Sequence, residues 1–414
     1  MPLRFSKNTL YQILFALCVS VPYLNNYELT FFVWACAIVI TIQRSYSIEL
    51  VKQILLFSGI LILAVFSSFF NEFSTYNFIR DITYLAKPVL GLLIGYQLGK
   101  TRLKDPLKTV IYTGVVLAIV HLWIVFYGIT FVGFRNIHQI RGYGGYFSDF
   151  EVYVIVLLLF HRDFNVEISA KQKKWFIAIL IFSSLFYLSR TNFIQFGILF
   201  IALKGFFVLN KKRLIALILI VFSGLLFYSA IVYYNPKRNG KGIEAFLYKV
   251  KIAPTEPFKT KINTEDYKDF NDNYRSVENI NTVKQTINDG WFTIVFGKGL
   301  GSSVDLKKEV WLDNAQLRYI SILHNGFMTV FLKSGIIGVF LLFISIFLLF
   351  RKQKSESTLI NKVNYLFTGT AFFLFISYWV FMGFYFKADT KAILIGLLLA
   401  YAEKIKRENT TVLK

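Results

Sequence analysis

Long apolar runs recur along this 414-residue chain, and they limit its possible folds more than any other feature. Two examples are WFIAILIFSSLFYL, which begins at Trp175, and LIALILIVFSGLLFYSAIVYY, which begins at Leu214. Lipid offers no water to the backbone, so each peptide N–H and C=O must be paired within such a segment, as in a helix. Hydrophobic residues make up 55% of the chain, and its mean hydropathy is +0.53. We therefore predict an all-α, polytopic transmembrane bundle that forms a single domain over residues 1–414.

The apolar runs divide into twelve predicted spans, and the basic residues orient them. The approximate ranges are 10–24, 28–42, 52–70, 81–98, 108–127, 147–160, 175–188, 192–209, 214–234, 323–350, 363–386 and 389–403. Every second connection is rich in Lys and Arg, as cytoplasmic loops are, which places both termini in the cytoplasm. These basic residues are Arg4, Lys7, Arg44, Lys52, Lys100, Arg102, Lys104, Lys108, Arg162, Lys171, Lys173, Lys174, Lys204, Lys211, Lys212, Arg213, Arg351, Lys352, Lys354, Lys404, Lys406 and Arg407. The net charge of +22 is therefore mainly an orientation signal and does not indicate a nucleic-acid partner.

The connection over residues 235–322 is much longer than an ordinary loop and is predicted to lie outside the cytoplasm. Connections of this length are either functional or disordered. Within it, VENINTVKQTIND places Val277, Ile280, Val283 and Ile287 near one face of a helix. Aromatic residues and glycines follow in GWFTIVFGKGLGS. We expect a large, partly helical extracytoplasmic loop within the membrane domain.

Several arginines on the predicted external side oppose the orientation rule, so a counter-charge is expected near them. They are Arg80, Arg135, Arg141, Arg190, Arg275 and Arg318. Arg190 is the best-defined candidate for a functional arginine because it lies in FYLSRTNFIQF, a short hinge between two spans. The alternative for Arg190 is a side chain that reaches lipid phosphates without binding a substrate.

Two other external segments have both a functional and a structural interpretation. Arg141 lies in IRGYGGYFSDFEVY, where the glycines allow close backbone approach to a phosphate. A simple turn with an ion pair from Arg141 to Asp149 or Glu151 is the alternative. His324, at the start of a span, is a candidate general base or hydrogen-bonding group, since a neutral ring suits a helix N-terminus. Its alternative is an interfacial histidine bonded to the backbone.

Acidic residues are nearly absent from the predicted spans, where the basic candidates for burial are Lys87, His121 and Lys333. Ion-coupled transporters carry carboxylates along their pathway, so this scarcity argues against one. The sequence also has no P-loop, no H-E-x-x-H and no Gly-rich dinucleotide motif. We expect no cofactor and no metal.

The order of these features resembles the O-antigen ligase and polymerase superfamily of bacterial membrane glycosyltransferases. LSRTN between two spans precedes a long external loop with YRSVENINTVKQTINDGWFTIVFGKGLGS, which ends at LHNGFMTVFLKSGIIGVFLLF. The positions that match in order, within residues 180–350, are Arg190, Arg275, Gly297 with Gly299, His324 with Asn325, and Gly335 with Gly338. Arg141 and its glycines resemble an upstream loop of the family. One departure is that Asn279 or Ile280 stands where an aromatic residue is common.

The resemblance implies polymerisation of undecaprenyl-diphosphate-linked repeat units into O-antigen or capsular polysaccharide at the external face of the bacterial inner membrane. It assigns catalysis to His324 and Arg190, and substrate binding to Arg275, Arg141 and Asn325. The implied partners are the lipid-linked glycan donor and acceptor, membrane lipids, a flippase and a chain-length regulator. One alternative is the ligase, which transfers the glycan to lipid A–core or another acceptor. A flippase for lipid-linked oligosaccharide is the alternative from another class, although no inverted repeat is visible.

The alternating basic loops predict which side of the membrane each segment occupies. A topology reporter fused near Asp269 is expected to be active only outside the cytoplasm. Fusions near Lys173 and at the C-terminus are expected to be active inside. Cytoplasmic activity at Asp269 would contradict the assignment of the chemistry to the external face.

Overall fold

The computed structural model describes residues 6–145, 148–187, 189–208, 211–240, 242–263, 265–312, 315–351 and 357–412. Its N-terminal half contains α1 (Lys7–Ser20), η1 (Val21–Leu24), α2 (Tyr27–Thr41), α3 (Ile48–Ser68), α4 (Thr75–Gln97), η2 (Leu98–Arg102), α5 (Pro106–Thr130), α6 (Ile137–Gly144), α7 (Asp149–Leu159), η3 (His161–Phe164), α8 (Ala170–Tyr187) and α9 (Arg190–Leu203). Its C-terminal half contains α10 (Lys211–Tyr234), α11 (Ile243–Ile252), η4 (Glu256–Phe258), α12 (Tyr267–Asp272), α13 (Tyr274–Asn288), α14 (Trp291–Phe296), β1 (Val304–Leu312), β2 (Ala315–Ile320), α15 (Gly326–Phe347), α16 (Thr358–Val380), η5 (Gly383–Tyr385) and α17 (Lys391–Val412). The predicted helical class is therefore confirmed.

Apolar helices of membrane-spanning length are present. Among the described residues, five helices are long and apolar enough to cross a membrane, namely α3, α5, α10, α15 and α16. The apolar helices α2 and α9 are shorter. Each of the twelve predicted ranges overlaps a helix, but the number of crossings stays a prediction. Of the predicted orientation residues, Arg4, Lys352 and Lys354 lie outside the described residues.

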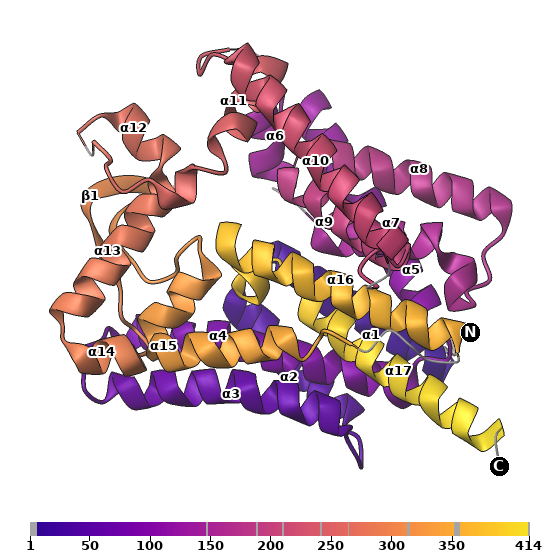
Figure 1. The fold of residues 1–414 in the computed structure, drawn as a ribbon. Coiled ribbons are helices and arrows are strands. Elements are labelled where there is room, and N and C mark those ends of the chain that lie inside the picture. Colours follow the sequence, from indigo (N-terminus) through magenta and orange to yellow (C-terminus); the bar gives the residue numbers. More distant parts are fainter. Residues whose placement is uncertain are drawn as a thin grey trace.

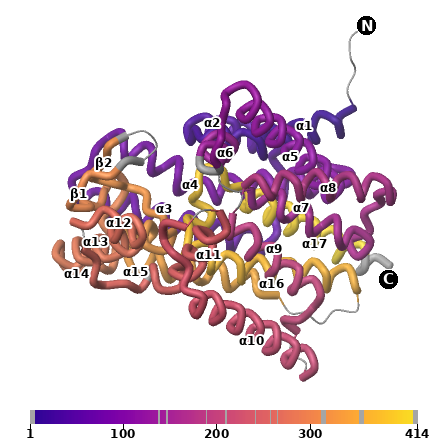
Figure 2. Tube along the Cα trace, turned by 90° about the horizontal axis from the view of Figure 1, so that it is seen from above, coloured from indigo at the N-terminus to yellow at the C-terminus, as the bar shows by residue number. Residues whose placement is uncertain are grey.

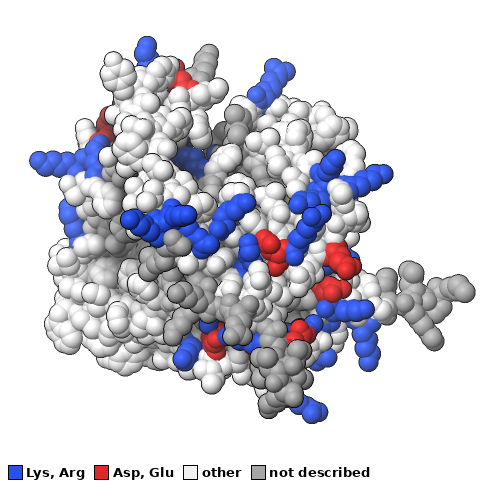
Figure 3. Space-filling view, turned by 45° about the vertical axis from the view of Figure 1, so that its right-hand side comes forward, with Lys and Arg blue, Asp and Glu red and all other residues white. Residues whose placement is uncertain are grey.

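The two ends of the molecule differ. Figure 1 shows both termini at one end of the bundle and helices α12, α13 and α14 at the other. Figure 3 turns the end with the termini forward and shows many Lys and Arg side chains on that face. Figure 2 shows α10 at the edge of the bundle, and only 6% of its apolar 18-residue stretch is buried inside the protein. Among the described residues, the sole sheet is the antiparallel β1–β2 hairpin, which the sequence did not predict.

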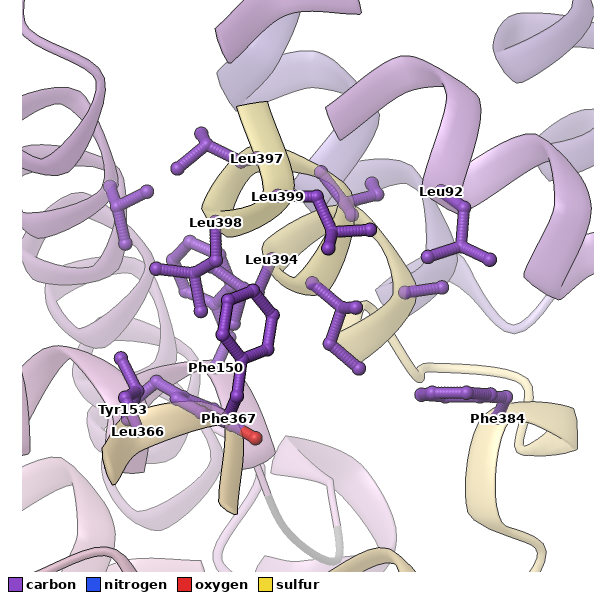
Figure 4. Packing of buried hydrophobic residues seen from close by; sticks show 14 of the residues in the cluster. Leu92, Phe150, Tyr153, Leu366, Phe367, Phe384, Leu394, Leu397, Leu398 and Leu399 are labelled. Atoms are coloured by element: carbon purple, nitrogen blue, oxygen red, sulfur yellow. The ribbon is translucent and has the colours of Figure 1, made fainter. Parts of the chain in front are cut away.

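The core is centred on α17, which packs closely against α4. A side chain added at Gly95 of α4 would collide with the carbonyl of Ile393, and one at Gly396 of α17 would collide with that of Leu92. Small residues let two helices approach this closely, which compensates for the weak hydrophobic drive between helices in lipid. Figure 4 shows the other side of α17, where its leucines meet Phe150 of α7 and Phe367 of α16.

Buried ion pairs tie several helices together, so the prediction that acidic residues are nearly absent there is wrong. Asp81 of α4 accepts from Lys333 Nζ of α15 at 2.5 Å, and both are 1% exposed. Lys391 of α17 pairs with both Asp149 of α7 and Asp389. Each carboxylate is near a helix end and paired, which offsets its loss of hydration. The predicted scarcity of acidic residues therefore no longer argues against a coupled transporter.

The first glycine of the Gly-x-x-Gly pattern in α15 marks a break in the helix. Gly335 has φ +64 and breaks the helix, and a side chain there would collide with the Val295 carbonyl. The break frees the carbonyls of Leu332 and Lys333, which accept hydrogen bonds from the backbone N–H groups of Lys298 (2.7 Å) and Gly299 (3.1 Å). The turn after α14 therefore fills the kink in α15 and fixes the start of the hairpin.

Replacing Gly335 with Ala is expected to destabilise the protein. The backbone angles of Gly335, φ +64 and ψ −164, are essentially restricted to glycine, so they alone cost an L residue about 1–3 kcal/mol, and the collision adds to this. Thermal unfolding of the detergent-purified protein, followed by Trp fluorescence, measures the loss. The matched control is Gly197→Ala on α9, where nothing lies within 4 Å and the melting temperature is expected to stay or rise. Equal melting temperatures for Gly335→Ala and wild type would contradict this role.

Candidate functional site

Arg190 begins α9, directly after the hinge that follows α8. Its Nη1 donates to the backbone carbonyl of Lys249 in α11 at 2.7 Å. The charges of Arg275, Glu256 and Arg141 all act on this guanidinium. Three arginines that are far apart in the sequence therefore lie in one electrostatic neighbourhood.

Arg275 lies in the first turn of α13 and faces a carboxylate from η4. The distance from Arg275 Nη1 to Glu256 Oε2 is 3.5 Å, and both side chains are largely shielded from solvent. Ser276, the next residue, donates from its hydroxyl to the backbone carbonyl of Glu256. Burial raises the pKa of the Glu256 carboxyl, while the charges of Arg275 and Arg190 oppose this. His324 also acts on Glu256 electrostatically, which places the histidine in the same neighbourhood.

His324 is held by a carboxylate that the sequence did not single out. Glu278 of α13 is fully buried and accepts two hydrogen bonds from His324, from the backbone N–H at 3.0 Å and from Nδ1 at 2.9 Å. The ring of Tyr274, one helical turn before Glu278, meets the imidazole edge-on at 5.5 Å. With the hydrogen on Nδ1, the basic atom of a neutral ring is Nε2.

The buried face of α13 differs from the predicted one. The predicted helix is present, but Ile287 is 54% exposed and Val283 is only half-buried. Val277 is buried as predicted, at 4% exposure, but the rest of the stripe that faces inward is polar and includes Glu278, Thr282 and Thr286. Their spacing of four residues was the available signal for Glu278. It was missed because apolar residues were used to choose the buried face.

Asn325 and Arg141, the other two predicted substrate-binding residues, lie on different helices. Asn325 is 1% exposed, and its side-chain oxygen accepts from the backbone N–H of Met328 at 3.2 Å, which caps α15. Arg141 is half-buried in the last turn of α6. Of the glycines after it, Gly144 packs on the bundle, since a side chain there would lie 3.1 Å from His121 Nε2, whereas nothing lies within 4 Å of a side chain added at Gly142. Asp149 pairs with Lys391, and Glu151 accepts from Tyr187 at 3.2 Å.

Two of the other arginines that are predicted to be external make contacts away from this neighbourhood. Arg318 forms a bidentate pair with Asp305 inside the hairpin, at 2.8 and 2.9 Å. Arg80 donates to the hydroxyl of Ser321. These two residues fix the hairpin, so the candidate site rests on Arg141, Arg190 and Arg275.

An apolar groove of about 480 Å³ is formed by α13, α15 and α16. Its lining comes from the helices that also build the site, with Val283 from α13, Phe327, Met328, Phe331, Ile336, Val339 and Phe343 from α15, and Phe375 and Trp379 from α16. Phe258 of η4 packs on Trp379, with ring centroids 5.6 Å apart. The groove and the Glu256-bearing segment are therefore in direct contact.

No protein-family model and no curated protein matches this chain. Within the described residues, no group of three or more His, Cys, Asp or Glu side chains is arranged to hold a metal. What the arrangement offers chemically is a cluster of guanidinium groups for an anion and a carboxylate-backed imidazole for proton transfer.

Removing the Glu278 carboxyl is expected to destabilise the junction of α13 with α15. Glu278→Ala leaves the backbone N–H and the Nδ1–H of His324 without this acceptor, at a cost of about 1–3 kcal/mol. Glu278→Gln keeps one acceptor oxygen and is expected to lose less. Thermal unfolding of the two purified variants against wild type measures the difference. An Ala variant as stable as wild type would show that this contact does not hold the two helices together.

Proposed function

We propose that this protein is a polyprenyl-diphosphate-dependent glycosyltransferase that joins lipid-linked repeat units into O-antigen or capsular polysaccharide. The observation that carries this proposal is the gathering of Arg141, Arg190 and Arg275 in one neighbourhood with the Glu278-backed His324. The proposed setting is the external face of the bacterial inner membrane, with twelve spans and both termini in the cytoplasm. A flippase and a chain-length regulator are the proposed protein partners.

The arginines suit the diphosphate of the donor. A guanidinium group presents a planar fork that bonds phosphate oxygens in pairs and stays charged at any physiological pH. In the proposed reaction, negative charge builds on the diphosphate as the sugar leaves, and Arg190 and Arg275 would stabilise it. Stabilisation of developing charge is commonly the largest contribution to catalysis. This also accounts for basic residues on the predicted external side.

His324 suits activation of the acceptor. In the proposed step, a hydroxyl oxygen of the acceptor sugar attacks the anomeric carbon of the donor. The bond from that carbon to the diphosphate oxygen breaks, and its electron pair leaves with undecaprenyl diphosphate. The hydroxyl proton passes to Nε2 of His324, while Glu278 stabilises the imidazolium that forms. Such general-base help contributes roughly 10²–10⁴-fold to the rate.

The apolar groove suits the polyprenyl tail. It extends along α15 from Phe327 to Phe343, a length of about 24 Å at 1.5 Å per residue. This exceeds the depth of one leaflet, about 15 Å. Phe327 and Met328, which line the groove, follow shortly after His324 and Asn325 in the sequence. A tail in the groove would therefore keep its head group near the arginines.

Substitution of Arg190 tests whether the site needs the planar guanidinium group or only a positive charge. Arg190→Lys keeps the positive charge but loses the planar fork, so polymerisation is expected to fall severely. The readout is the length distribution of the polysaccharide on gels in a strain that lacks the native gene, with a membrane-protein blot for expression. The matched control is Arg135→Lys, an exposed arginine just before α6, which is expected to behave as wild type.

Substitution of His324 tests proton transfer by the same readout. His324→Ala is expected to abolish most long-chain polymer at a normal protein level. His324→Gln is expected to retain activity only if hydrogen bonding suffices, and little if the ring must accept a proton. Full-length polymer from His324→Ala at a wild-type protein level would refute the catalytic role.

A further inference from the structure

Asn279 lies on α13 next to two parts of the candidate site. Arg275 is one helical turn before it and shares its face of the helix. Glu278, which accepts from His324 Nδ1, is the residue directly before it. At 1.5 Å per residue, Asn279 is about 6 Å along the helix from Arg275 and almost level with Glu278. One turn of α13 therefore carries a guanidinium group, an amide and the carboxylate that holds the histidine.

The amide of Asn279 is buried, but its oxygen has no partner in the fold. The residue is 9% exposed, and its Oδ1 accepts no hydrogen bond from any described residue. A buried polar atom without a partner destabilises a protein, so native folds leave few of them. Other buried polar side chains of the same helix do have partners, namely Ser276, Glu278, Thr282 and Thr286. Asn279 Oδ1 therefore differs from them in adding nothing to the fold by hydrogen bonding.

Asn325 shows the same feature with the opposite atom. It directly follows His324, is 1% exposed, and uses its Oδ1 to cap α15. Its Nδ2 donates to no residue in the part of the chain that the structure describes. Asn279 and Asn325 are thus each next in the chain to one member of the Glu278–His324 pair, and they offer one acceptor and one donor. Sugar hydroxyls both donate and accept, so they match such a pair of amides.

We propose that Asn279 is a sugar-binding residue, whose Oδ1 accepts a hydrogen bond from a hydroxyl or acetamido group of the sugar joined to the diphosphate. This inference rests on the proposed function. An oxygen acceptor needs a donor. The diphosphate linkage has no N–H or O–H at neutral pH, whereas a sugar has several hydroxyl groups.

The position of Asn279 agrees with the proposed step. In that step the anomeric carbon lies between the diphosphate and the hydroxyl that His324 deprotonates. The sugar that carries this carbon must therefore reach from the level of Arg275 to the level of Glu278 and His324. Asn279 lies at the second level, on the face of α13 that also carries Arg275.

The test compares two probes that bind the full-length protein in nanodiscs: farnesyl-diphospho-glucose, which carries the sugar, and farnesyl diphosphate, which does not. Asn279→Leu is expected to bind the sugar-bearing probe about three- to tenfold more weakly than wild type does, the range for one lost hydrogen bond. Its affinity for farnesyl diphosphate is expected to equal that of wild type. Asn279→Ala is expected to show the same pattern with a smaller side chain. Asn288→Leu, at an exposed position near the end of the same helix, is the matched control and is expected to match wild type with both probes.

Thermal unfolding without a probe separates a binding role from a structural one. Because Asn279 Oδ1 has no partner among the described residues, Asn279→Leu, with a side chain of similar branching, is expected to keep or raise the melting temperature. Lower melting temperatures for both Asn279 variants, together with equal losses of affinity for the two probes, would show that the residue supports the fold and would overturn the inference.

The remaining outcomes separate this inference from the proposed function. If Arg190→Ala abolishes binding of both probes but Asn279→Leu binds both as wild type does, the role of Asn279 is overturned and the proposed function stands. If neither probe binds wild type, or if binding is insensitive to Arg190→Ala, the proposed function fails and the inference fails with it.

Discussion

A buried carboxylate is tolerated only when it is paired, and the pairing of Glu278 with His324 is the contact on which the site depends. Glu278 is fully buried and accepts hydrogen bonds from both the ring Nδ1 and the backbone N–H of His324. This contact holds α13 against the start of α15. Because Arg275 lies on the same helix one turn earlier, the contact also sets where that guanidinium points. Without it, the arginine and the histidine would belong to separately mobile elements.

The same principle organises the rest of the bundle. Asp81 with Lys333 joins α4 to α15, and Lys391 with its two aspartates joins α17 to α7. The side chains of these pairs are buried between helices, whereas Arg190 and Arg275 are only half-buried and contact the segment from Lys249 to Glu256. That contrast separates charges that stabilise the fold from charges that can exchange partners for a ligand.

The helices and the positions of Arg190 and His324 could be predicted from the sequence because the patterns that indicate them are local. Apolar runs locate the helices, a short hinge locates Arg190 at a helix start, and a span that begins at His324 locates the histidine. Glu278 and Glu256 could not be found in this way. Their partners lie 46 and 19 residues away along the chain, so only the folded loop reveals them. The kink at Gly335 was missed for the same reason, since the turn that fills it comes from residues 298 and 299.

The long segment that precedes α15 is part of the candidate site. Segment 235–322 supplies Glu256, Arg275 and Glu278, while the bundle supplies Arg190 and His324. Neither part holds the complete set of charges. A substrate that bridges the membrane surface, with an anionic head group and an apolar tail, would contact both.

The most direct test of glycosyl transfer is the stoichiometry of lipid release by the purified protein in proteoliposomes supplied with an undecaprenyl-diphosphate-linked repeat unit. The proposed step requires one undecaprenyl diphosphate to be freed for each glycosidic bond formed, with no added nucleotide or metal in the reaction balance. Movement of intact lipid-linked oligosaccharide across the bilayer, with no lipid released and no longer glycan formed, would contradict the account and identify a transporter.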